Sequence, residues 1–339
     1  MTGLQLLWFV LIAVLFSGFF FLEGFDYGVG ISSLFLAKDD REIDQAISSI
    51  GPFWDGNEVW LLTAGGAMFA SFPYWYASLF SGFYIILFLI LVGLILRGVS
   101  FEFRHRALSK KGHNFWEKVL GISSLFIPFM LGLLFTSFIQ GMPMDAHGNV
   151  TGGFFDYVNL LSVVGGVAVA LLSWLHGLNY LSLKVNGPLR DRAHDWANKL
   201  YFVLYAGEIV FAVLLFIFTD FFKTMTIDGV KKNAILTVIL LAVIVGLSVL
   251  AHLANRQKKE MLAFLSSGLT FVALVALLFQ GIFPRVMIAN NPANDILIRN
   301  ATSTGYTLTT MTIVALCILP FVLVYIGWTY FIFRKRIEK

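Results

Sequence analysis

Long apolar runs separated by short polar segments dominate the chain. Nine runs approach the roughly 20 apolar residues that a membrane-spanning helix needs, and they cover residues 4–36, 53–72, 75–96, 119–139, 160–183, 200–218, 234–254, 261–283 and 309–333. The run 53–72 is the weakest, because Asp55 and Glu58 lie within it. The pattern predicts an all-α integral membrane protein with nine transmembrane helices.

Composition agrees with this prediction. Hydrophobic residues make up 58% of the chain and charged residues 13%, and the mean hydropathy is +0.81. A soluble domain cannot bury so much apolar surface. The basic residues behind the net charge of +4 are spread over the loops, which favours membrane topology over nucleic-acid binding. The single cysteine, Cys317, excludes a disulfide framework and a thiolate metal cluster.

The distribution of Lys and Arg predicts an orientation. With the N-terminus outside, the cytoplasmic loops and the C-terminal tail hold 19 of the 24 basic residues, and the outer loops hold five. Cytoplasmic loops of membrane proteins are enriched in basic residues. We therefore expect the N-terminus outside and the C-terminus in the cytoplasm. Arg97 is counted here as a loop residue, so no Lys or Arg is expected beside acids within the membrane.

Two pairs of segments resemble each other at a distance along the chain. LEGFDYGVG from Leu22 resembles LHGLNYLSL from Leu175, and FIQGMP from Phe138 resembles LFQGIFP from Leu278. Short antiparallel connections suit four-helix bundles. The repeat therefore predicts two bundles within a single membrane domain, covering residues 1–142 and 155–285. A peripheral ninth helix with a basic tail follows at 305–339.

Ionisable residues inside the predicted spans are the candidates for function, because each costs about 2.5–3.5 kcal/mol to insert. They are Glu23, Asp26, Asp55, Glu58, His176 and Glu208. Glu23 with Asp26, and Asp55 with Glu58, are three residues apart and share a helix face. The first two spans are joined by a short loop, so we expect the four acids to gather near the cytoplasmic side. Burial and nearby like charges favour protonated carboxyls, so the cluster is predicted to handle protons.

Structural alternatives exist for the acidic residues. Asp55 follows Pro52 at a helix start, where a negative charge favours the helix dipole. Glu23 and Asp26 would also fit a small water pocket without proton transfer. For Glu208, a hydrogen bond to a neighbouring helix and a place in a relay are equally favoured.

The remaining polar and aromatic candidates have alternatives of their own. For His176, donation to a backbone carbonyl is favoured over metal ligation. Trp54 and Asn57 also suit the headgroup level of a membrane interface, which tryptophan favours.

Particular stretches of the chain resemble a known family. GFDYGVG at 24–30, GPFWDGNEVWLLTAGGAMFASFP at 51–73 and FSGFY at 80–84 are similar to subunit II of the cytochrome bd quinol oxidases. LRGVSFEFR at 96–104 and FIQG at 138–141 extend the similarity. The resemblance covers essentially the whole chain and agrees with a nine-span layout.

The resemblance implies a subunit of a respiratory-chain enzyme in the bacterial cytoplasmic membrane. Its partner, subunit I, would carry haems b and d and oxidise quinol, while this chain would supply no haem or metal ligand. The complex would reduce oxygen to water with cytoplasmic protons and would not pump. Small accessory subunits and a structural quinone in this chain are left open.

The resemblance also assigns roles to residues. Asp26 and Asp55 match acidic positions of the family's proton route, and Asn57 and Trp60 belong to the same motif. Glu58 stands where some relatives have Gln, and Glu23 is matched less securely. A proton-coupled transporter and a purely structural scaffold are the alternative functions.

Overall fold

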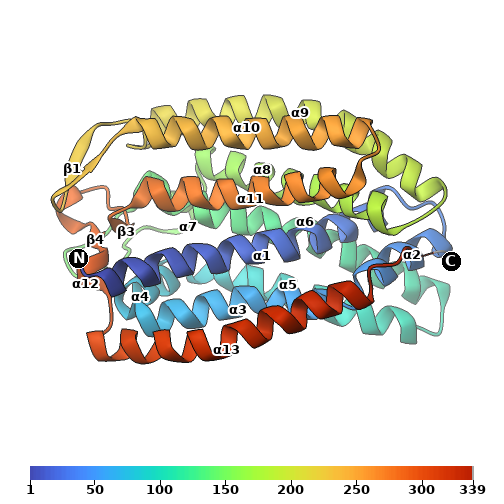
Figure 1. Cartoon of the computed structure of the whole chain (residues 1–339), viewed down its shortest axis with the longest axis horizontal. Coiled ribbons are helices and arrows are strands. Elements are labelled where there is room, and N and C mark those ends of the chain that lie inside the picture. The colour runs from blue at the N-terminus through green and yellow to red at the C-terminus, as the bar shows by residue number, and fades with distance from the viewer. Residues whose placement is uncertain (338–339) are drawn as a thin grey trace.

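Helices follow the apolar runs, and several continue into the polar connections. The computed structural model describes residues 1–337 (Figure 1). In chain order the elements are α1 (Gly3–Phe35), α2 (Asp40–Ile50), α3 (Trp54–Ser71), α4 (Pro73–Gly82), α5 (Tyr84–Arg106), α6 (Lys110–Gln140), α7 (Phe154–Tyr157), α8 (Leu160–Lys184), α9 (Pro188–Phe218), β1 (Met225–Ile227), β2 (Val230–Lys232), α10 (Ala234–Arg256), α11 (Glu260–Ile282), β3 (Arg285–Met287), the 3-10 helix η1 (Pro292–Asn294), β4 (Ile296–Leu297), α12 (Ile298–Ala301) and α13 (Gly305–Ile332). The short strands form two antiparallel pairs, β1 with β2 and β3 with β4.

The chain is a multi-pass membrane protein. Eight helices within residues 1–337 are long and apolar enough to cross a membrane, namely α1, α5, α6, α8, α9, α10, α11 and α13. Helix α3, in the weakest predicted run, has 18 residues and packs along α1 (Figure 1). It is not among the eight, so the count of nine spans stays a prediction.

One predicted span is wrong in its boundaries. The run 75–96, expected as a single helix, is divided between α4 and α5, and α5 continues to Arg106. The break lies at Phe83, which is fully buried with its ring 4.8 Å from that of Tyr157. Val150 packs so closely on Gly82 that a Cβ there would lie 2.5 Å away. The packing of Gly82 and Phe83 against Val150 and Tyr157, which precede α8, thus compensates for the helical hydrogen bonds lost at the break.

The centre of the molecule is formed by α1, α6, α8 and α11, which pack against one another. Helices α1 and α8 approach so closely that a Cβ on Gly28 would lie 2.7 Å from the Cα of Gly177. The predicted units 1–142 and 155–285 therefore share one core. Helix α13 lies at the periphery, with only Leu308 buried. Residues 338 and 339 of the predicted segment 305–339 lie outside the described residues.

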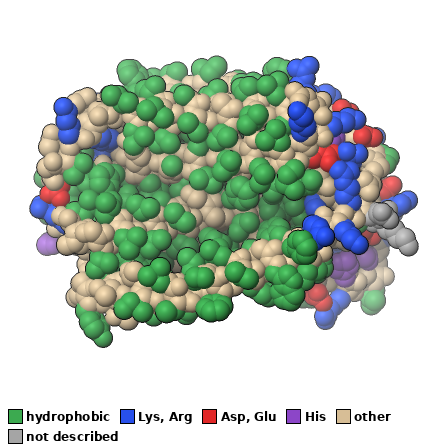
Figure 2. Space-filling model, in the orientation of Figure 1, with side chains coloured by type: hydrophobic (Ala, Val, Ile, Leu, Met, Phe, Trp, Pro, Cys, Tyr) green, Lys and Arg blue, Asp and Glu red, His purple; other side chains and the backbone are tan. Residues whose placement is uncertain are grey.

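The two ends of the bundle differ in charge. The N-terminus and the strand pairs lie at one end, and α2 lies at the other, where its Gln45 donates to the carbonyl oxygen of Ile337 (Figure 1). We call these the N-terminal end and the C-terminal end. Figure 2 shows Lys, Arg, Asp and Glu side chains gathered at the C-terminal end, with mostly hydrophobic side chains between the two ends. The prediction that the C-terminus lies in the cytoplasm rests on this uneven distribution of Lys and Arg.

Candidate functional site

Helices α1, α3 and α5 bring a group of charged side chains together. Glu23 and Asp26 on α1 are fully buried, as is Arg97 on α5. Arg97 forms an ion pair with Glu23, and its Nη1 lies 3.4 Å from Oε2 of Glu58 on α3. On the same turn of α3, Asn57 donates from Nδ2 to Oδ2 of Asp26 at 2.7 Å. We call Glu23, Asp26, Glu58 and Arg97 the acidic cluster.

Arg97 corrects an expectation. We expected no basic residue beside the membrane acids, because the predicted third span ended at residue 96. Instead α5 runs through Arg97 to Arg106, and the guanidinium of Arg97 faces α1. It also lies 4.7 Å from the ring centroid of Tyr27. An arginine one residue past an apolar run resembles a loop residue, and only the length of the helix places it in the interior.

The acidic cluster has more acids than bases. Two of its three carboxyls, those of Glu23 and Glu58, contact its single guanidinium, and the third, that of Asp26, accepts from Asn57. Several of its buried polar atoms have no hydrogen-bond partner within residues 1–337: Glu23 Oε2, Asp26 Oδ1, and Nε and Nη2 of Arg97. Buried polar atoms in native proteins are nearly always paired. An excess of carboxyls with free lone pairs can bind protons and water.

The solvent exposure of the predicted acids decreases from Asp55 through Glu58 to Glu23. Asp55 in the first turn of α3 is exposed, and the structure gives it no hydrogen bond or ion pair within residues 1–337. The Glu58 side chain, one turn further, is 23% exposed, and that of Glu23 is not exposed. The structure therefore brings together three of the four predicted acids, and Asp55 lies at the surface beside them.

The tryptophans of the motif pack around this cluster. Trp54 stacks on Phe101 of α5 with ring centroids 4.6 Å apart. Trp60 lies against α1 at Gly18, where a Cβ would clash with the Trp60 ring. Only glycine fits at this contact. The two rings thus fix α3 to α5 and to α1 on either side of the acids.

His176 occupies the place in α8 that corresponds to Glu23 in the repeat. Its Nε2 lies 2.9 Å from the carbonyl oxygen of Phe21, and its Nδ1 lies 2.8 Å from Oγ of Ser267. A carbonyl only accepts, so Nε2 carries the proton. The predicted donation to a backbone carbonyl is confirmed. Both ring nitrogens are engaged, which leaves neither one for a metal in this arrangement.

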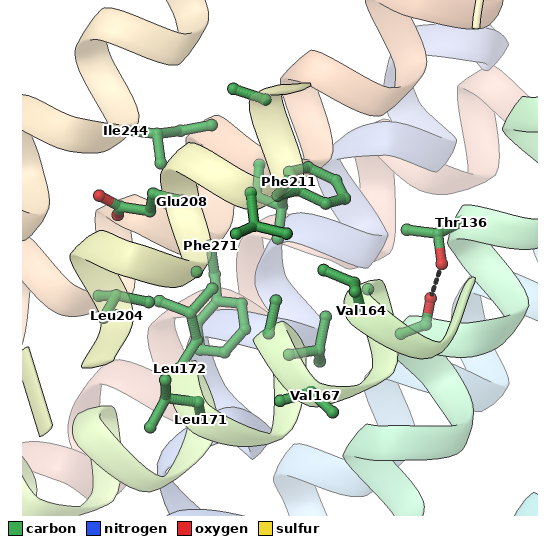
Figure 3. A pocket seen from close by; sticks show the side chains of 18 of the residues that line it. Thr136, Val164, Val167, Leu171, Leu172, Leu204, Glu208, Phe211, Ile244 and Phe271 are labelled. Atoms are coloured by element: carbon green, nitrogen blue, oxygen red, sulfur yellow. Dashed lines mark hydrogen bonds between the residues drawn. The ribbon is translucent and has the colours of Figure 1, made fainter. Parts of the chain in front are cut away.

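Glu208 on α9 accepts a hydrogen bond of 2.6 Å from Ser248 on α10. This is the neighbouring-helix contact that was one of its two expected roles. Glu208 lines a cavity of about 480 Å³ between α8, α9, α10 and α11. Figure 3 shows its carboxylate turned away from Phe211. The lining is otherwise mainly apolar, including Leu172 and Phe271.

A second group of buried charges lies at the N-terminal end. Asp220 pairs with Lys232 at 2.8 Å and with Arg285 at 2.7 Å, and Arg285 lies 3.3 Å from Asp295. We call these four residues the outer ion cluster. Burial opposes ionisation of Asp220, but Arg285 and Lys232 outweigh it and lower the pKa of this carboxyl. Burial raises the pKa of Asp295, against the hydrogen bond from Ala289 and the charge of Arg285.

Among residues 1–337 there is no group of three or more His, Cys, Asp or Glu side chains that could hold a metal ion.

The fold and the site define a class: a multi-pass helical membrane protein with an excess of acids buried between its first helices. A family model described as "Cytochrome bd terminal oxidase subunit II" matches residues 4–333. The chain therefore belongs to the cytochrome bd terminal oxidase subunit II family.

Named relatives agree with this family. The chain is 43% identical over 339 residues to cytochrome bd ubiquinol oxidase subunit 2 of Bacillus subtilis, covering 100% of this chain and 98% of the relative. It is 32% identical over 362 residues to cytochrome bd-I ubiquinol oxidase subunit 2 of Escherichia coli K12, covering 99% and 96%. A chain in the structure of bd oxidase from Geobacillus thermodenitrificans aligns with a TM-score of 0.74 at 15% identity, covering 98% of this chain and 100% of that one. The last match shows the fold alone.

Proposed function

We propose that this chain is the second subunit of a quinol:oxygen oxidoreductase and carries protons from the cytoplasm toward the oxygen-reducing site. The family and the names of the relatives support the enzyme class. The observation that carries the proton role is the excess of carboxyls over bases in the buried acidic cluster. A cluster that only held helices together would gain from balanced charges.

The route begins at the C-terminal end, which we place in the cytoplasm because the basic residues gather there. Asp55 lies exposed at the start of α3 and collects protons from solvent. Glu58, one turn deeper and near Arg97, receives them next. Glu23 and Asp26 are the fully buried members, and Asp26 is held by Asn57. Each carboxyl accepts a proton and releases it to the next group through water.

Arg97 keeps this group of acids from being fully neutral. A guanidinium stays protonated in proteins, so it holds at least one neighbouring carboxyl in the ionised form. An ionised carboxyl is ready to accept the next proton. Arg97 thereby keeps the acids able to accept a proton, and its positive charge favours the release of that proton to the next group.

The partner and the cofactors follow from the same family. We propose a haem-bearing subunit I as the partner, with haems b and d on that chain, and possible small accessory subunits beside it. Bound there, the haems would supply electron transfer and oxygen reduction, with quinol as the electron donor. This chain would contribute protons, and the complex would not pump. The cavity beside Glu208 fits the apolar chain of a structural quinone, since its lining is almost entirely apolar.

Two other functions remain distinct from this proposal. A proton-coupled transporter would need a substrate site of its own, typically with broken helices at mid-membrane. A scaffold subunit would tolerate neutral replacements of Glu23, Asp26 and Glu58 without any change in turnover.

The proposal is tested on the purified complex. We expect a haem-bearing partner to copurify with this chain, and quinol-dependent oxygen uptake to be lost when this chain is omitted. Asp26→Asn should keep the haem spectrum and lower oxygen uptake by roughly tenfold or more, the effect of losing a proton-transfer group. Glu102→Gln, an exposed acid paired with Arg106, is the matched control and should change nothing. Normal uptake in Asp26→Asn would contradict the proton role.

A further inference from the structure

Helix α13 is peripheral for most of its length but contacts Asn57, the neighbour of the acidic cluster, at one point. At the N-terminal end, Trp8 of α1 donates to the carbonyl of Leu308 at 3.2 Å and to Oγ1 of Thr312 at 3.0 Å. At the other end, Tyr330 donates from its hydroxyl to Oδ1 of Asn57 at 3.0 Å. No other residue of α13 forms a side-chain hydrogen bond to α3 within the described residues.

The contact fixes the amide that faces Asp26. Asn57 donates from Nδ2 to Asp26 Oδ2 at 2.7 Å and to the carbonyl oxygen of Leu22 at 3.2 Å. Its Oδ1 faces away from Asp26 and accepts from Tyr330. The Leu22 carbonyl oxygen can only accept, so the Asn57 atom that faces it must be the donor Nδ2. Both side-chain polar atoms of Asn57 are thereby assigned. A flipped amide would place Oδ1 against two acceptors, the Asp26 carboxylate and the Leu22 carbonyl oxygen, and Tyr330 would have to accept from Nδ2 instead of donating to Oδ1.

The ring of Tyr330 is itself held in place. It stacks on Phe53, the residue before α3, with ring centroids 4.4 Å apart and an interplanar angle of 9°. Beyond α13 the tail is tied down: Ile337 donates from its backbone N–H to the carbonyl of Lys184 at 2.8 Å, and Gln45 donates to the carbonyl of Ile337 at 3.1 Å. The end of α13 is therefore fixed relative to α3 and α8.

We propose that Tyr330 is a positioning residue for proton transfer, which holds Asn57 as a hydrogen-bond donor toward Asp26. The proposal rests on the proposed proton role of Asp26. An amide locked as a donor favours the carboxylate form of Asp26, so that a bound proton is released instead of being trapped by a hydrogen bond to Oδ1. Helix α13 thus contributes one hydroxyl to the proton route, through Asn57.

The test is a double-mutant cycle on the complex, with quinol-dependent oxygen uptake and haem content as readouts. Tyr330→Phe removes one oxygen atom and should lower uptake by about threefold to tenfold, the range expected for one hydrogen bond. Tyr325→Phe, on an exposed part of the same helix, is the matched control and should leave uptake unchanged. In an Asn57→Ala background, Tyr330→Phe should have no further effect, because Tyr330 acts through Asn57.

The outcomes separate this inference from the proposed function. If Tyr330→Phe leaves uptake unchanged while Asp26→Asn lowers it, the positioning role is wrong and the proton route stands. If Tyr330→Phe lowers uptake or haem content equally with and without Asn57, the tyrosine serves the fold and the inference is overturned. If Asp26→Asn has normal uptake, the proton route itself fails.

Discussion

The acidic cluster and the outer ion cluster are both buried groups of charged residues, and they differ in balance. The outer cluster has two acids and two bases, and each of its acids contacts a base. The acidic cluster has three acids and one base, with several polar atoms unpartnered within residues 1–337. A balanced group is suited to hold segments together, and an unbalanced one can gain and lose protons. Neutral replacements should therefore affect stability in the first and turnover in the second.

Asp220→Asn should have the largest effect on stability. It removes the carboxyl that Lys232 and Arg285 share and leaves two buried cations with Asp295 alone. Breaking a buried ion pair on one side costs about 3–5 kcal/mol. Thermal unfolding of the purified complex would measure the loss. A change within about 0.5 kcal/mol, as is usual for a surface substitution, would show that the cluster does not hold the fold.

Arg97→Gln should cost less stability than Asp220→Asn. The acids that it leaves behind can take up protons and become neutral, whereas arginine in the outer cluster cannot lose its charge. Oxygen uptake should fall at the same time, because no ionised carboxyl is maintained for the next proton. The two variants are compared by thermal unfolding under the same conditions. An equal or greater loss for Arg97→Gln would mean that the acidic cluster is also a structural ion pair.

The pH dependence of stability should differ between wild type and Asp220→Asn. The pKa of Asp220 is lowered in the folded protein by Arg285 and Lys232, against the effect of burial. Its contribution is therefore present above the ordinary aspartate value of about 4 and is lost as pH falls through the lower folded value. The advantage of wild type should shrink on acidification below about pH 4. An advantage that stays constant would show that Asp220 is not stabilised as an ion.

Asp55→Asn should have the smallest effect. Asp55 is exposed and outside the contacts of the cluster, so water can replace it as a proton collector. We expect oxygen uptake to fall by less than about threefold, well below the effect of losing a buried proton-transfer group. Steady-state oxygen uptake with haem content as the control would measure it. A loss as large as that of Asp26→Asn would place Asp55 within the obligatory route.

The sequence predicted the helical membrane class and the family, because long apolar runs and the WDGNEVW motif are local signals. It predicted that four acids would gather, since pairs three residues apart share a face of adjacent helices, and three of them do: Glu23, Asp26 and Glu58. The fourth, Asp55, stays at the surface, because it lies in the first, exposed turn of α3. It missed Arg97 and Tyr330. The first lies one residue past an apolar run, and the second is one of several aromatics in a lipid-facing helix. Their roles depend on how α5 and α13 pack, which no local pattern encodes.

The outer ion cluster was missed for a related reason. Lys232 and Arg285 were counted as loop residues in the charge distribution, and their positions in the chain do not indicate burial. They become partners of Asp220 only because the loops after α9 and α11 fold over one another at the N-terminal end. The burial and pairing of these residues thus depend on tertiary contacts between loops that are distant in the sequence.

The central claim is that protons pass through Asp26, and proton uptake tests it most directly. The complex is reconstituted in vesicles with a pH-indicating dye on the side that the C-terminal end faces, and the reduced enzyme is mixed with oxygen. Wild type should take up protons from that side during oxygen reduction. In Asp26→Asn the rate of proton uptake should fall by roughly tenfold or more, with an unchanged haem spectrum. Uptake at the wild-type rate in Asp26→Asn would contradict the account.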